Sequence, residues 1–153
     1  MSNRKIVKDI SLQLLSEGKT IRIKAHGYSM YPCIRPGSIV LIEPIALKGK
    51  PAPGEIIAIK RESGLVVHRM VKTVVKNGIT LYIARGDSNA YSDNPVAYDK
   101  IIGRITGVEI TGENPVPANI KINTKPRYFY NRLRVIGIIL WKKFRKLYNS
   151  FKT

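Results

Sequence analysis

One serine, Ser29, lies in a segment whose neighbours restrict the backbone on both sides. Residues 24–40 read KAHGYSMYPCIRPGSIV, so the serine stands between Gly-Tyr and Met-Tyr-Pro, ahead of a Pro-Gly turn. A serine hydroxyl becomes a useful nucleophile only when a base lies within hydrogen-bond reach and is itself oriented. A serine that must be presented at a fixed angle would explain such a segment, whereas an ordinary surface serine does not require it.

The candidates for the base are few, because the chain has only 2 histidines. His68 lies in LVVHRMV, an apolar strand-like run in which a lone polar side chain must point in a defined direction. A satisfied core histidine is the simpler interpretation of His68 taken alone. His26 lies three residues before Ser29 on the same segment, a position from which it reaches the hydroxyl less readily.

Two carboxylates, Asp87 and Asp93, lie in ARGDSNAYSDNPV, residues 84–96. Turn sequences of this kind are common, so the stretch is weak by itself. Together with Ser29 and His68 it supplies a nucleophile, a base and a carboxylate, the set that acyl transfer needs. The single cysteine, Cys33, excludes an internal disulfide and is interpreted as a small apolar filler rather than a reactive thiol. Such a histidine and cysteine content is too small for a structural zinc site, and we expect no metal or cofactor.

The elements that must position these residues are mostly strands. Ile6, Ile10 and Leu14 recur at helical spacing and predict an N-terminal helix within residues 1–20 that stops near residues 17–18. Gly, Pro or Asn then separates strand-like runs that predict a compact, mainly β and mostly antiparallel domain over residues 21–111. The runs are residues 20–25, 37–44, 54–61, 64–75, 78–85 and 100–110.

The C-terminal part of the chain has a different character. Residues 112–126 contain prolines and no helical period, and predict a linker. Residues 127–153 contain no acidic residue and predict a basic amphipathic helix. Its apolar stripe is Leu133, Ile136, Leu140, Phe144, Leu147 and Phe151. Such a helix lies in a membrane interface with its basic side chains on anionic headgroups; the alternative is a helix packed back on the β domain.

The overall charge agrees with an anionic partner, because 27 Lys and Arg against 10 Asp and Glu give +17. Charge alone does not choose between anionic lipid and nucleic acid, or exclude a merely solvated basic surface. The N-terminus lacks a signal-peptide-type apolar core, and no window has the roughly 20 apolar residues of a membrane span. We therefore expect a protein associated peripherally with the cytoplasmic face of a membrane through its C-terminal helix, with nucleic acid a less favoured partner.

The stretches GYSMYPCIRPGSIV, GEIIAIK, VVHRMV and RGDSNAYSDNPV resemble, in this order, the conserved boxes of type I signal peptidases. The resemblance covers roughly residues 25–110, and it implies the coiled, barrel-like β-fold that these enzymes share with self-cleaving SOS-type repressors (S24 and S26 peptidases). A histidine before the arginine, as in His68, is typical of the archaeal and endoplasmic-reticulum type. Tyr28 and Gly27 depart from the signal-peptidase pattern, and the Gly-x-Ser-Met form is more similar to the repressors.

The resemblance implies Ser29 as nucleophile, His68 as general base and Asp93 as the carboxylate that orients the histidine. Asp87 is implied as a supporting aspartate, although which of the two aspartates orients His68 stays open. It also implies a peptide substrate with small residues one and three positions before the cut. We therefore expect a signal-peptidase-like serine endopeptidase acting at a membrane surface. The alternative is a catalytically silent β module that binds anionic membrane or nucleic acid.

Overall fold

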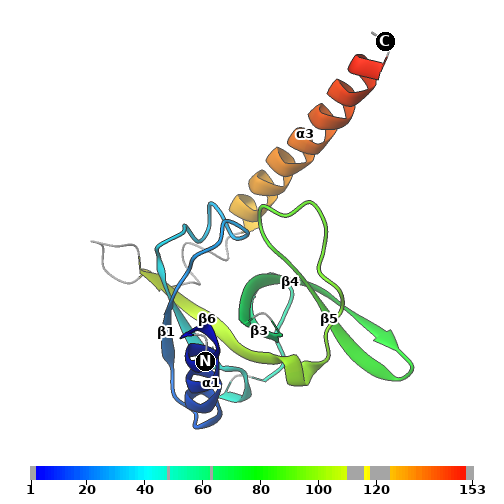
Figure 1. Ribbon diagram of the computed structural model, residues 1–153. Helices are drawn as coiled ribbons and strands as arrows, with labels where there is room; N and C mark the ends of the chain where they lie inside the picture. The colour runs from blue at the N-terminus through cyan, green and yellow to red at the C-terminus, as the bar shows by residue number, and fades with distance from the viewer. Residues whose placement is uncertain (1–2, 48, 63, 110–115, 118–124, 151–153) are drawn as a thin grey trace.

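A curved antiparallel sheet forms the centre of the protein (Figure 1). The computed structural model describes residues 3–47, 49–62, 64–109, 116–117 and 125–150. The strands follow the order β1-β2-β6-β3-β4-β5, and β7 joins β6 off this path. Their bounds are β1 Ile21–Lys24, β2 Ile39–Pro44, β3 Ile56–Arg61, β4 Gly64–Lys76, β5 Ile79–Arg85, β6 Ile101–Glu109 and β7 Val116–Pro117.

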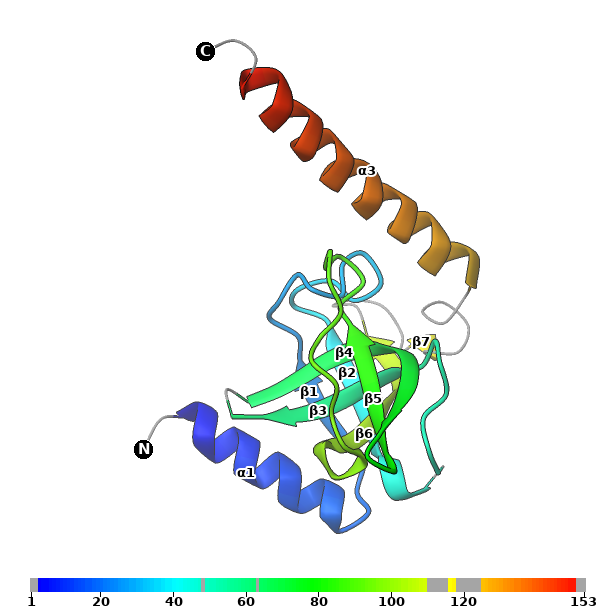
Figure 2. The ribbon, with the colours of Figure 1, turned by 90° about the vertical axis from the view of Figure 1, so that its right-hand side faces the viewer.

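The predicted mainly β class is confirmed, and each of the six strand-like runs matches one of the strands β1 to β6 to within two residues at either end. The sheet is not a closed barrel. Among the described strands, β1 pairs only with β2, and β5 pairs only with β4 apart from an isolated bridge between Tyr82 and Val96. Strand β4 curves strongly across the sheet, which brings its two ends against different parts of the molecule (Figures 1 and 2).

The first four residues of β3 are buried on both faces, which explains why they are all apolar whereas the strand ends in Lys60 and Arg61. Ile56 and Ala58 belong to one hydrophobic cluster, whereas Ile57 and Ile59 belong to the other, and each of the four is 0% exposed. Successive side chains of a strand point to opposite faces, so the stretch of a strand that lies between two clusters must be apolar at every position. Other members of the first cluster are Leu15, Met30, Ile34 and Val40, and others of the second are Met70, Tyr82 and Ala84.

Helix α1, Asn3–Ser16, ends just before the residues at which the sequence predicts a stop. The C-terminal half of the helix packs against the sheet, where Ser11 and Leu15 are buried and Leu14 contacts the first cluster. Ile6 and Ile10 remain 42% and 52% exposed, so most of the predicted apolar stripe lies at the surface.

Helix α3, Lys125–Ser150, contains most of the predicted C-terminal helix and projects away from the sheet (Figure 2). The exposed fractions of Leu133, Leu140 and Phe144 are 52%, 60% and 69%, so this part of the stripe is not packed on the β domain. The side chain of Leu147 and all of Phe151 lie outside the described part of the chain. No helix in the described ranges is both long and apolar enough to cross a membrane.

The predicted linker contains one short strand. Val116 and Pro117 of β7 pair with Val108 and Gly107 of β6. Strand β3 pairs with β6 only as far as Arg104, so the edge of β6 beyond that point is open to β7. The rest of the predicted linker, residues 112–115 and 118–124, lies outside the described residues, except that residues 125–126 already belong to α3.

Candidate active site

Ser29 lies in the connection between β1 and β2, where buried side chains fix the backbone. Met30, the next residue, and Ile34 are 3% and 2% exposed and anchor the segment in the first cluster. The amide of Ile34 donates to the carbonyl of Met30 at 2.9 Å, and the amide of Tyr31 donates to that of Tyr28 at 3.0 Å. Consecutive turns tied to the core therefore hold Ser29 half-buried at the surface.

The loop after β5 docks on the backbone of Ser29. The Ser88 amide donates to the Ser29 carbonyl at 2.9 Å, and its hydroxyl donates to the carbonyls of Ser29 and Tyr28 at 3.0 and 2.6 Å. Gly86 makes this approach possible, because a Cβ there would lie 2.7 Å from the Ser29 carbonyl oxygen. The loop after β5, which contains Asp87 and Asp93, is thus bonded directly to the backbone at Ser29, although the two segments are far apart in sequence.

His68 and Asp93 meet at hydrogen-bond distance, with Nδ1 of the histidine 2.6 Å from Oδ2 of the aspartate. His68 lies in β4 opposite Ile57 and is 7% exposed. The Asp93 amide donates to the Ala84 carbonyl at 2.8 Å, which holds the loop against β5. An ionised carboxylate can only accept, so a neutral His68 carries its proton on Nδ1 and presents a lone pair at Nε2.

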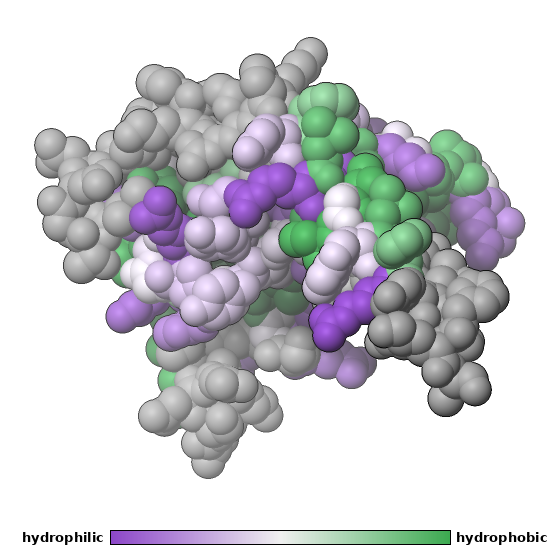
Figure 3. Space-filling model, turned by 90° about the horizontal axis from the view of Figure 1, so that it is seen from above, coloured by the Kyte–Doolittle hydropathy of each residue, from purple (hydrophilic) through white to green (hydrophobic). Residues whose placement is uncertain are grey.

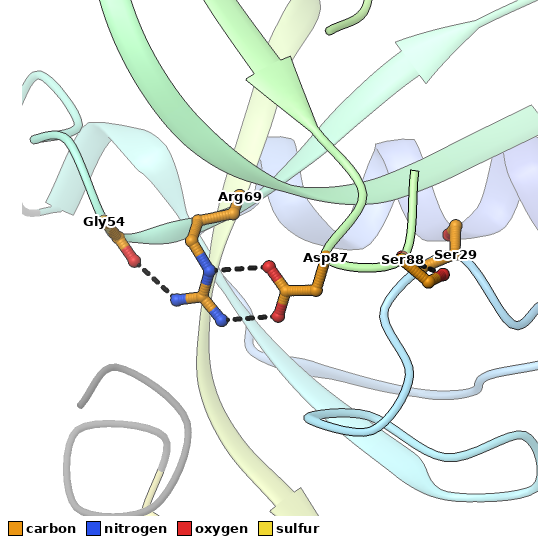
Figure 4. Close-up of polar contacts among 5 residues, drawn as sticks. All are labelled: Ser29, Gly54, Arg69, Asp87 and Ser88. Atoms are coloured by element: carbon orange, nitrogen blue, oxygen red, sulfur yellow. Dashed lines mark hydrogen bonds and ion pairs between the residues drawn. The ribbon is translucent and has the colours of Figure 1, made fainter. Parts of the chain in front are cut away.

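Asp87 has a different partner. Its carboxylate accepts from Nε and Nη2 of Arg69 at 2.8 and 2.7 Å, and Nη1 of Arg69 donates to the Gly54 carbonyl at 2.8 Å (Figure 4). The side chains of the pair are 2% and 0% exposed. A bidentate pair of this kind fixes orientation as well as charge. Each member of the pair adjoins a residue of the candidate site. His68 precedes Arg69 and contacts Asp93, and Ser88 follows Asp87 and contacts the backbone of Ser29.

The sequence left open which of the two aspartates contacts His68, and the structure gives them different partners. Asp93 contacts His68, and Asp87 ties the start of its loop to β4 through Arg69. Arg69 was visible in the sequence only as the arginine after the histidine, and its buried position was not predicted. Ser88 was also missed, because a serine after Asp in a turn carries no distinguishing signal of its own.

In the part of the chain that the structure describes, Ser29 and His68 are not joined by a hydrogen bond. Among the described residues, neither the hydroxyl nor the amide of Ser29 has a hydrogen-bond partner. Catalytic hydrogen bonds are often long or poorly aligned without substrate and tighten only in the complex. An unpaired amide next to a serine hydroxyl is also the donor that an oxyanion requires during acyl transfer.

The remaining candidates lie outside this arrangement. His26 is exposed, and Cys33 is partly buried against the first hydrophobic cluster, in agreement with its interpretation as an apolar filler. Over the described ranges, no three His, Cys, Asp or Glu side chains gather as metal ligands would.

A comparison with protein-family models matches residues 3–112 to the Peptidase S24-like family. No curated protein matches the chain. The match supports the broader superfamily to which the sequence motifs pointed, without selecting the type I signal peptidases within it. Since the matched region covers most of the chain and contains every residue of the site, the protein belongs to the Peptidase S24-like family.

Proposed function

We propose that the protein is a signal-peptidase-like serine endopeptidase that cleaves a leader or signal peptide at a membrane surface. In this proposal Ser29 is the nucleophile, His68 the general base and Asp93 the carboxylate that orients the histidine. The observation that carries it is the 2.6 Å contact between Nδ1 of His68 and Oδ2 of Asp93, which leaves Nε2 available for proton transfer. The S24-like family supports the peptidase part of the proposal.

The reaction follows the general scheme of acyl transfer to serine. Oγ of Ser29 bonds to the carbonyl carbon of the scissile peptide while its proton passes to Nε2 of His68. The Ser29 amide donates to the oxyanion that forms. The carbon–nitrogen bond then breaks as His68 returns the proton to the leaving amine. Water attacks the resulting ester, again giving its proton to His68, and the acid is released with the hydroxyl restored.

Helix α3 supports the membrane part of the proposal. Its exposed apolar side chains include Leu133, Leu140 and Phe144, and its sequence contains basic but no acidic residues. Figure 3, which views the protein from above, shows hydrophobic side chains gathered beside hydrophilic ones. A helix of this kind binds anionic interfaces by burying its apolar side chains and by the attraction of its basic side chains to the headgroups. On this proposal the enzyme works from the cytoplasmic face as a peripheral protein.

The proposed substrate has small residues one and three positions before the cut. Such a peptide would lie as an extended strand beside an edge of the site, so that alternate side chains enter shallow pockets. Shallow pockets exclude bulk by steric overlap, which costs more than the about 1–3 kcal/mol of a missing methylene. Tyr28, which is 71% exposed beside Ser29, would narrow the approach further.

A second candidate function is a catalytically silent β module that binds an anionic surface. The observation that favours it is the absence, in the described part of the chain, of a hydrogen bond from the Ser29 hydroxyl to His68. This candidate uses the basic helix and the folded sheet but requires no cleavage.

The deciding experiment is hydrolysis of a peptide library by the parent, Ser29→Ala, His68→Ala and the double variant. We expect cleavage after Ala, Gly or Ser by the parent, a loss in each single variant and little further loss in the double variant, since the pair acts as one unit. Melting curves provide the control for folding. A Ser29→Ala variant that cleaves as fast as the parent would contradict the proposed serine-peptidase mechanism. Cleavage after large apolar or basic residues would contradict only the proposed substrate specificity.

A further inference from the structure

Arg132, in the first part of α3, contacts the loop that contains Asp87 and Asp93. Its Nη1 donates to the carbonyl of Asn89 at 3.2 Å and its Nη2 to the carbonyl of Ala90 at 3.3 Å. The arginine is partly buried by this contact. Figures 1 and 2 both show the start of α3 near the end of the sheet from which this loop extends.

The point of contact lies between the two parts of the loop that build the site. Before it, Ser88 donates to the Ser29 carbonyl, and after it Asp93 contacts His68. A guanidinium group has a planar fork of donors, so it can hold two successive carbonyls in one orientation. Arg132 therefore contacts the loop where the chain runs from Ser88, which contacts Ser29, to Asp93, which contacts His68.

The middle of the loop has little other support. The Asn89 amide donates to the Gly86 carbonyl at 3.0 Å, and the next backbone tether is the Asp93 amide on Ala84. Between them Tyr91 is 81% exposed. A loop segment with few buried contacts opens at low free energy unless something outside it holds it.

We propose that Arg132, from α3, is a positioning residue that holds the loop after β5 (the Asp93 loop) so that Asp93 stays in contact with His68. The inference rests on the proposed function for its catalytic consequence, although the contact itself is tested separately. It gives the C-terminal helix a second role: besides any binding to a membrane, the helix supports the carboxylate that faces His68.

The first test is amide hydrogen exchange of the full-length protein without lipid, comparing Arg132→Ala with Arg134→Ala. Arg134 has the same charge and is exposed on the same helix, so it is a matched control. We expect the amides of Ser88, Asn89 and Asp93 to exchange about tenfold faster in Arg132→Ala, as for the loss of a charge-assisted hydrogen bond, and to be unchanged in Arg134→Ala. Unchanged exchange in both variants would overturn the proposal.

The second test is the kinetics of peptide hydrolysis, with Arg61→Ala as a control outside the site and outside α3. Because Arg132 acts through the Asp93 loop and not on the substrate, Arg132→Ala should lower kcat by about tenfold or more and leave KM near the parent value. Arg132→Lys should recover part of the loss, since an ammonium group keeps the charge but cannot hold both carbonyls as the fork does. Equal loss in kcat for Arg61→Ala, or none for Arg132→Ala, would contradict the positioning role.

The two measurements keep the inference separate from the proposed function. If the parent cleaves no peptide, the proposed function fails, while exchange at the loop amides still decides whether Arg132 holds the loop. Protection of the core amides of Ile57 and Ile59 shows whether a variant is folded. If Arg132→Ala proves unfolded, Arg132→Lys is compared with Arg134→Lys in the same exchange experiment, with loop exchange again required to rise in the first alone.

Discussion

At the scale of single residues, the site assigns different tasks to two aspartates in one short loop. Asp93 is 18% exposed at its side chain and contacts His68, whereas Asp87 is fully buried at its side chain against Arg69. A buried ion pair that loses one partner leaves an uncompensated charge, while a partly solvated carboxylate can be replaced at lower cost. A conservative substitution should therefore mainly lower stability at Asp87 and mainly lower activity at Asp93.

The prediction is that Asp87→Asn lowers the free energy of unfolding by about 3–5 kcal/mol, because the Arg69 guanidinium keeps its charge in a buried place. Asp93→Asn should keep most of the stability but lower kcat by up to about 10⁴-fold, since an amide does not hold the histidine tautomer that a base requires. Urea unfolding and peptide hydrolysis on the same preparations measure both quantities. The separation of roles is wrong if Asp93→Asn is fully active or if Asp87→Asn is as stable as the parent.

At the scale of elements, the site depends on the docking of the loop after β5 against the turns that hold Ser29. Gly86 is at the closest point, where the Cβ of any other residue would also lie 2.8 Å from Nδ2 of Asn89. The Asn89 side chain can move, but the Ser29 carbonyl belongs to a backbone anchored by Met30. A larger residue must therefore push the loop away from the serine.

We expect Gly86→Ala to lower the free energy of unfolding by about 1–3 kcal/mol, the usual cost of overpacking, and to reduce kcat by weakening the bonds from Ser88 to Ser29. Gly107→Ala is the matched control, because its Cβ would meet Leu41 only at ordinary contact distances of 3.5 Å or more. That control should be as stable as the parent or more stable by up to about 1 kcal/mol. Denaturant unfolding of the two variants checks this, and equal stability of Gly86→Ala and the parent would contradict the tight docking.

At the scale of the whole molecule, a strongly basic chain presents an exposed apolar helix beside a folded sheet. Arg145 lies 5.4 Å from the ring centre of Trp141, which is itself 59% exposed, so apolar and cationic groups are mixed on this helix. Each Lys or Arg near an anionic bilayer contributes about 1 kcal/mol, and salt screens that attraction over about 10 Å at 0.1 M.

The full-length protein should therefore float with anionic vesicles at low salt and detach as salt rises. Phe144→Glu should weaken this binding, because the substitution removes an apolar side chain and adds a negative charge on α3. Val75→Glu is a matched control, since Val75 is 72% exposed, against 69% for Phe144, but lies in the β4–β5 hairpin. Vesicle flotation measures all three proteins. Equal binding to neutral and anionic vesicles would contradict the contribution of charge to binding. Equal weakening by the two substitutions would contradict the role of α3 as the membrane-binding element.

The sequence by itself determined the elements of this protein, because their signals are local. Alternating or unbroken apolar runs separated by Gly, Pro or Asn predicted each strand from β1 to β6, and an apolar stripe without acidic residues predicted α3. Ser29, His68, Asp87 and Asp93 could also be selected from the sequence, since the nucleophile, base and carboxylate of acyl transfer are restricted to few residue types.

Only the tertiary structure decided which of these residues meet. The two aspartates are six positions apart in one turn-rich loop, and no local pattern shows that one contacts β4 at His68 and the other at Arg69. These pairings follow from the curvature of the sheet and from where the loop docks on it. The contact of Arg132 with that loop joins residues 42 and 43 positions apart. Contacts of this kind depend on how distant elements pack, which periodicity in the sequence does not encode.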